Sequence, residues 1–265
     1  MGQSDGRDRV ADAGPGRTEY PNPPIVEVVC QVTFADAVPW SVASPGLLWT
    51  AIRDEYPSEP NALGGGVEAS FGQTQGQNEV RVNQQAPRYV FSNSDQNRRV
   101  VTNGSCLSVN GLAPYEKWPS LAARFAKAID AFSTTIASFV PESVSIRYIN
   151  RVVIPESRFD LDDYFNVPIF KSHQEGALLQ QLVARSRTFV PDTSVQTTIT
   201  FASADDQTEH ESSFVLDIEL VQPVQPDAQA DDLLSVAEKL HVLENREFES
   251  SITAKTRELF YGNDR

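Results

Sequence analysis

VSIRYINRVVI, at residues 144–154, is a run of mostly β-branched and aromatic residues that predicts one long central strand. Alternate side chains of a strand share a face, so Tyr148 points one way and Arg147 and Arg151 point the other. Apolar residues occur on both faces, which is typical of a strand covered on both sides. We therefore expect the two guanidinium groups to be at least partly buried, where each needs a carboxylate or carbonyl partner. The alternative is that both arginines extend to the sheet edge and keep their charges in water.

Two glutamates lie in apolar surroundings and could supply such a carboxylate. Glu27 interrupts the first apolar strand. It is either an exposed edge charge that deters aggregation or one member of a buried ion pair. Glu244 lies near the middle of the apolar face of the closing helix, with His241 at the border of that face. The Glu244 side chain is either exposed to solvent or in contact with Arg147 or Arg151. The candidate binding cluster consists of Glu27, Arg147, Tyr148, Arg151, Asp217 and Glu244. Such a cluster serves general acid–base chemistry if a pocket opens beside it, or it is a structural ion-pair network.

Strands occur in blocks between helices along the chain. Strand patterns are expected at residues 25–34, in a meander over 68–109, and at 144–154, 178–190, 195–201 and 214–221. Helical spacing of apolar residues is expected from Ser44, over 118–139, and in a closing helix over 231–259. This order predicts an α+β fold with mainly antiparallel sheet packed against three main helices.

The block of strands followed by a helix occurs twice. Residues 21–262 are therefore expected to form a single globular unit, and its order is compatible with two related halves, 21–140 and 141–262. A curved sheet that holds the last helix often encloses a ligand cavity. The leading residues 1–20 are polar and rich in glycine, which predicts a disordered N-terminal tail.

The chain is strongly acidic, with 265 residues, a formal net charge of −14 and a sequence pI near 4.6. This charge argues against a nucleic acid or an anionic membrane as the main partner, because phosphate binding needs clustered Lys and Arg. A basic protein or a small molecule fits better. A homo-oligomer is also compatible with the sequence.

Cysteine usage predicts a reducing compartment. Cys30 and Cys106 each lie in an apolar run and are expected to be buried thiols and not a disulfide framework. The first twenty residues lack the apolar segment of a secretory signal, and no later apolar run is long enough to span a bilayer. We therefore expect a cytoplasmic protein.

The sequence contains none of the strong catalytic or cofactor signatures. It has no HExxH, no GxSxG, no paired CxxC, no GxGxxG that opens a helix and no GxxxxGK[ST]. His173, His210 and His241 are scattered, which argues against a zinc site. We expect no metal and no cofactor, and the sequence leaves catalysis open while favouring a protein that is not an enzyme.

Several stretches resemble a sporadically distributed family of bacterial and archaeal proteins of about 260 residues. The stretches are YPNPPIVEVVCQVTF near the start, IRYINRVVIP followed by LDDYF in the centre, VLDIEL, and LHVLENREFESSITAKTRELF near the end. The resemblance covers nearly the whole chain in order, and it brings no catalytic residues with it. Its patchy distribution is similar to that of mobile defence or toxin–antitoxin loci, which is an analogy and not a mechanism.

Two functions follow as hypotheses. The first is a non-enzymatic binding or regulatory protein that engages another protein, basic in charge, as an inhibitor or adaptor. The second is a small-molecule sensor or enzyme with a pocket between the sheet and the closing helix, which predicts a cavity of a few hundred Å³.

Overall fold

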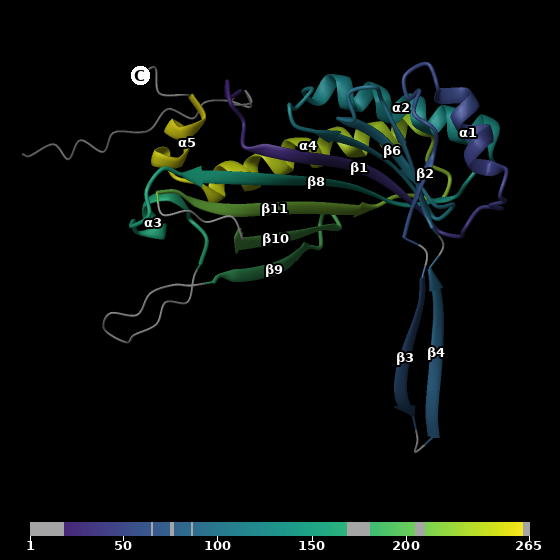
Figure 1. Cartoon of the computed structure of the whole chain (residues 1–265), viewed down its shortest axis with the longest axis horizontal. Coiled ribbons are helices and arrows are strands. Elements are labelled where there is room, and N and C mark those ends of the chain that lie inside the picture. The colour runs from purple at the N-terminus through teal and green to yellow at the C-terminus, as the bar shows by residue number, and fades with distance from the viewer. Residues whose placement is uncertain are drawn as a thin grey trace, which may run out of the picture.

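A single large antiparallel sheet with helices on one face forms the body of the protein (Figure 1). The computed structural model describes residues 19–64, 66–74, 77–85, 87–168, 181–204 and 210–261. Within these residues the sheet has nine strands in the order β2-β5-β6-β7-β1-β8-β11-β10-β9. The predicted α+β class with mainly antiparallel sheet is confirmed.

Two long strands, β1 (Ile25–Phe34) and β8 (Pro141–Ile154), form the centre of the sheet. They run antiparallel, with Val28 opposite Tyr148. Both strands bury every second residue against the helices, as the alternation of their apolar residues requires. The remaining strands of the sheet are β2 (Asn61–Leu63), β5 (Arg88–Ser92), β6 (Arg98–Thr102), β7 (Cys106–Leu112), β9 (Val183–Val190), β10 (Val195–Ser203) and β11 (Ser212–Pro223).

The two sides of this central pair share one connectivity. On one side the meander β5-β6-β7 ends in β7, which pairs with β1. On the other side the meander β9-β10-β11 ends in β11, which pairs with β8. In each case a long strand is followed by a helix, and a three-stranded meander and a second helix come later, although on the first side residues 61–85, which include β2, lie between the helix and the meander. The central pair β1–β8 is therefore the place where two similarly connected parts of the chain meet.

Three main helices pack on the same side of the sheet (Figure 1). They are α1 (Ser44–Ile52), α2 (Trp118–Thr135) and α4 (Ala230–Ser251), and they are accompanied by the short helices α3 (Leu161–Tyr164) and α5 (Ala254–Tyr261). Helix α2 lies on β7, and α4 crosses β8 and β11. Leu240 of α4 and Phe125 of α2 are fully buried, so the core lies between these two helices and the sheet.

The expectation that β8 is covered on both sides is wrong. Val144, Ile146 and Val152 are fully buried against the helices, whereas Arg147 and Arg151 on the opposite face are exposed. A single layer of helices leaves the other face of an antiparallel sheet in contact with water. The apolar residues on that face remain partly exposed, Val153 among them at 37%.

The predicted closing helix over 231–259 is divided into α4 and α5. Ile252 leaves the helical conformation and forms an isolated antiparallel bridge with Phe165, and Thr253 donates a backbone hydrogen bond to Tyr164. At Ile252 and Thr253, these contacts with the α3 region take the place of hydrogen bonds within a helix. Helix α2 likewise ends at Thr135, before the predicted limit of 139.

The predicted meander over 68–109 contains a separate element. Strands β3 (Gly66–Thr74) and β4 (Gln77–Gln85) pair only with each other among the described residues, and Figure 1 shows them extending away from the main sheet. The β6–β7 turn contains Gly104, with a φ of 83° that favours glycine. A Cβ at that position would lie 3.1 Å from Trp40 Cβ, so a larger residue there would also be tightly packed against Trp40.

Both cysteines are free and buried, which agrees with the prediction of buried thiols. Burial raises the pKa of each thiol above its usual range, so both remain protonated at neutral pH. The predicted tail, 1–20, lies outside the described residues except for Glu19 and Tyr20. Residues 178–180 of the predicted strand 178–190 also lie outside them. In the described part of the chain, no helix combines the length and the apolar character needed to cross a bilayer.

Candidate functional site

Four of the six candidate residues lie on the open face of the sheet. Arg147 donates two hydrogen bonds to Asp217, from Nε to Oδ1 at 2.8 Å and from Nη2 to Oδ2 at 2.6 Å. This two-pronged contact raises the pKa of Arg147. Glu27 accepts a hydrogen bond of 2.8 Å from the Asn110 amide. Arg151 is exposed and donates to the Ser213 hydroxyl at 3.3 Å.

The other two candidates, Tyr148 and Glu244, lie on the helix-covered face. Each is 2% exposed. The hypothesis that Glu244 meets Arg147 or Arg151 in the interior is therefore wrong, because Arg147 and Arg151 differ from Tyr148 by an odd number of positions along the strand and point to the other face. The six residues form two separate groups on opposite sides of the sheet.

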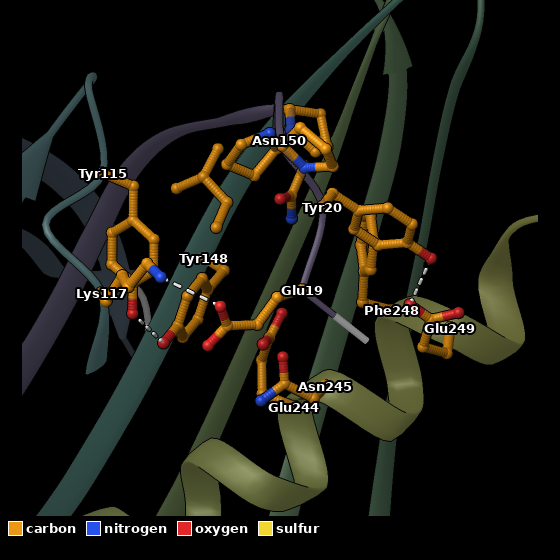
Figure 2. Close-up of a pocket in the computed structure, with 14 residues that line it drawn as sticks. Glu19, Tyr20, Tyr115, Lys117, Tyr148, Asn150, Glu244, Asn245, Phe248 and Glu249 are labelled. Carbon is orange, nitrogen blue, oxygen red and sulfur yellow. Dashed lines mark hydrogen bonds and ion pairs between the residues drawn. The ribbon is translucent and has the colours of Figure 1, made fainter. Parts of the chain in front are cut away.

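A cavity of about 390 Å³ opens beside Tyr148 and Glu244. Figure 2 shows Glu244 and Asn245 on α4 facing the space next to Tyr148 of β8, with Glu19 extending into the same space. The cavity thus lies between the sheet and the closing helix. Its lining residues are Glu19, Tyr20, Pro21, Pro23, Pro24, Ile25, Tyr115, Lys117, Tyr148, Asn150, Glu244, Asn245, Phe248 and Glu249.

Tyr115 and Tyr148, which line this cavity, belong to a connected group of aromatic side chains. The Tyr148 hydroxyl lies 2.8 Å from His241 Nδ1 and 3.1 Å from the Tyr115 hydroxyl. The His241 ring stacks on Trp118 with centroids 4.4 Å apart. This group joins β8, α4 and the loop before α2, so the position of each ring is set by elements distant in sequence.

Residues 19–24 form the outer wall. The Tyr20 hydroxyl donates to Glu249 Oε1 at 2.6 Å, and burial together with this bond raises the pKa of Tyr20. The Asn22 amide donates to the Phe260 carbonyl at 3.0 Å, and Lys117 Nζ lies 2.9 Å from Glu19 Oε2. The N-terminal segment thereby connects α4, α5 and the loop before α2 across the cavity, although Glu19 and Tyr20 belong to the stretch expected to be a disordered tail.

A second buried polar cluster was not predicted. Arg124 and Glu116 form an ion pair with side chains 5% and 6% exposed. Arg124 also donates to the Tyr56 hydroxyl at 2.8 Å and to the Asn110 carbonyl at 3.0 Å. Burial disfavours the guanidinium charge, but the contacts with Glu116 and Tyr56 outweigh burial and raise the pKa of Arg124. The signal in the sequence was the position of Arg124, three residues after Leu121 within the apolar stripe of α2.

This cluster also borders a polar hollow of about 480 Å³ near α1 and α2. Every nitrogen of the Arg124 guanidinium has a protein acceptor, so the cluster is built as a structural connection between the elements around it. The cavity beside Tyr148 and Glu244, walled by aromatic rings, amides and a buried carboxylate, is the better candidate for a binding site.

Among the described residues, no group of three or more His, Cys, Asp or Glu side chains has an arrangement that could hold a metal ion. His241 contacts the cavity-lining Tyr148 and stacks on Trp118. In comparisons with known proteins, no family model and no curated protein matches this chain.

Proposed function

We propose that this protein binds a small molecule in the cavity between β8 and α4, and that it acts as a sensor of that molecule. The observation that carries the proposal is the cavity itself, which has the size of small-molecule sites and combines apolar walls with a few polar groups. Its wall includes residues from the N-terminal segment, the central strand and the closing helix.

The sensor role follows from which elements the cavity joins. Residues 19–24 are held across it by contacts that include the hydrogen bonds of Tyr20 with Glu249 and of Asn22 with Phe260. A ligand that touches both this segment and α4 stabilises the conformation in which the segment is docked, by its differential affinity for the docked state. The bound state is then distinguishable by any partner that recognises this end of the molecule.

Filling the cavity should abolish binding. The probes are tryptamine, tryptophol and indole-3-acetate, measured by ligand-observed NMR on the full chain. Ligands of about a dozen heavy atoms are expected to bind with a roughly millimolar Kd. At least one probe should bind the wild-type chain, and Ile25→Trp, which places an indole in the cavity, should remove that binding.

The control for this test is Val26→Trp, the same substitution at the next position, which is 36% exposed and does not line the cavity. It should bind the probes like the wild-type chain. Probes that bind Ile25→Trp as well as they bind the wild-type chain would show that the cavity is not the binding site.

A second function, engagement of another protein, is favoured by the edge strand β9. Val183, Phe189 and Val190 of this strand are 68%, 60% and 48% exposed, and no described strand pairs with its outer edge. An exposed apolar edge is a template on which a segment of another protein adds a strand. The net charge of −14 favours a basic protein as that partner.

Phe189→Glu tests this second function. Affinity capture from cells of the native host should recover a basic partner with the wild-type chain and lose it with Phe189→Glu, because strand addition would bury the new charge. Val42→Glu is the matched control, since Val42 is 99% exposed and far from β9 in sequence. A partner recovered equally with Phe189→Glu does not use β9.

A further inference from the structure

An asparagine interrupts the buried face of the central strand. The helix-covered face of β8 is apolar and fully buried at Val144, Ile146 and Val152, and Asn150 lies on the same face at 2% exposure. A buried amide is costly unless its polar atoms have partners. The Asn150 Nδ2 atom has one, because it donates to the Leu216 carbonyl at 3.2 Å. The question is what the oxygen of the same amide serves.

The cavity wall contains two such amide oxygens, from Asn150 on β8 and Asn245 on α4 (Figure 2). The Asn245 Nδ2 atom donates to the His241 carbonyl at 2.8 Å. A carbonyl only accepts, so these bonds fix which atom of each amide is the nitrogen. No described residue donates a hydrogen bond to either amide oxygen. Both oxygens are therefore acceptors that a molecule in the cavity can use.

The side-chain donors of the same wall already have acceptors. Tyr20 donates to Glu249, and Lys117 donates to Glu19. The hydroxyl groups of the other two tyrosines that line the cavity are hydrogen-bonded to each other. The three prolines of the outer wall have no backbone N–H. Among the described lining residues, the polar groups left for a ligand are therefore mainly acceptors, and they suit a ligand that donates.

We infer that the ligand of this cavity is a planar ring compound with an N–H donor in the ring, and that this donor bonds to Asn150 Oδ1. The inference rests on the proposed small-molecule function. The rings of Tyr148 and Phe248 and the prolines of the outer wall supply apolar surface for the faces of such a ring. A cavity of about 390 Å³ fits a body of one or two rings. A ring without a donor would displace water from Oδ1 and leave that atom without a hydrogen bond.

The test pairs each indole probe with its 1-benzofuran analogue, in which an oxygen atom replaces the ring N–H. The two members of a pair have nearly the same shape and the same side chain, so their difference in affinity reports the ring donor. On the wild-type chain, the indole member of at least one pair should bind more tightly by roughly fivefold or more, because the benzofuran leaves a buried acceptor without a donor. Ligand-observed NMR on the full chain measures both dissociation constants. This comparison needs no variant, so it decides the ligand class even if a substitution at Asn150 prevents folding.

Asn150→Leu identifies the residue responsible. Leucine continues the apolar face of β8 and removes the acceptor, so the preference for the indole member should fall below about twofold. Asn61→Leu is the control, since it makes the same substitution on the exposed strand β2, away from the cavity lining. It should keep the wild-type preference. If Asn150→Leu does not fold, an intermolecular NOE on the wild-type chain, between the ring N–H of the probe and the Asn150 side chain, reports the same contact.

The possible outcomes separate the two proposals. If both members of every pair bind equally and Ile25→Trp abolishes their binding, the ring donor is the wrong ligand feature and the cavity remains the binding site. If Asn150→Leu keeps the full preference for the indole member, or if the NOE is absent, the assignment to Asn150 is overturned. If none of the probes binds, or if binding survives Ile25→Trp, both the ligand class and the proposed function are overturned.

Discussion

Glu116→Gln is expected to lower the free energy of unfolding by about 3–5 kcal/mol. The substitution keeps the shape of the side chain and removes its charge, so the Arg124 guanidinium is left buried at 5% exposure without its carboxylate. An uncompensated buried charge is much more costly than the loss of a surface pair. Small domains are stable by only about 5–15 kcal/mol, so chemical denaturation should show a large shift of the midpoint in urea.

Asp217→Asn is the matched control for that experiment. It also removes a carboxylate from a two-pronged contact with an arginine, but the Arg147 and Asp217 side chains are 45% and 17% exposed on the open face of the sheet. Water replaces much of the lost interaction there, and the expected loss is below about 1 kcal/mol. Equal losses for the two variants would contradict the assignment of Arg124 and Glu116 as the buried structural pair.

Leu240→Ala is expected to destabilise the protein by about 2–5 kcal/mol. Leu240 is fully buried where α4 packs on the sheet, so truncation loses apolar burial and leaves a void that close-packed neighbours fill only in part. The same helix carries Glu244 and Asn245, so binding of the indole probes should weaken together with the stability. Urea denaturation and ligand-observed NMR on the same sample measure both effects.

Val242→Ala provides the comparison on the same helix. Val242 lies two residues from Leu240 and is 39% exposed, so its truncation should change the stability by less than about 1 kcal/mol. A loss for Leu240→Ala that is no greater than for Val242→Ala would mean that α4 is not held by the contacts described above.

The fold was largely predictable because its strands and helices are marked by local patterns. The first strand was predicted at 25–34 and is observed as β1 (Ile25–Phe34), since its alternation is bounded by prolines before it and a loop after it. The division of the closing helix was not predictable, because the bridge between Ile252 and Phe165 depends on a residue 87 positions earlier in the chain. Helix propensity depends on neighbouring residues in the sequence and gives no information about that contact.

The candidate site was predictable only in part. Tyr148 and Glu244 were both assigned to the candidate cluster, and the structure places both in the wall of one cavity. Glu27, Arg147, Arg151 and Asp217 were assigned to the same cluster, but they lie on the opposite face. The pattern of β8 separates its two faces and does not say which of them the helices cover.

By itself, the sequence determined which residues alternate on each strand, which helix faces are apolar and which charges interrupt them, because these follow from the period of 2 or 3.6 residues in the backbone. Only the tertiary structure decided that Glu244 faces Tyr148 and that Arg124 meets Glu116. It also decided that residues 19–24 close the outer side of the cavity. These contacts join segments distant in the chain, and which distant segments meet depends on how the whole sheet and its helices pack together.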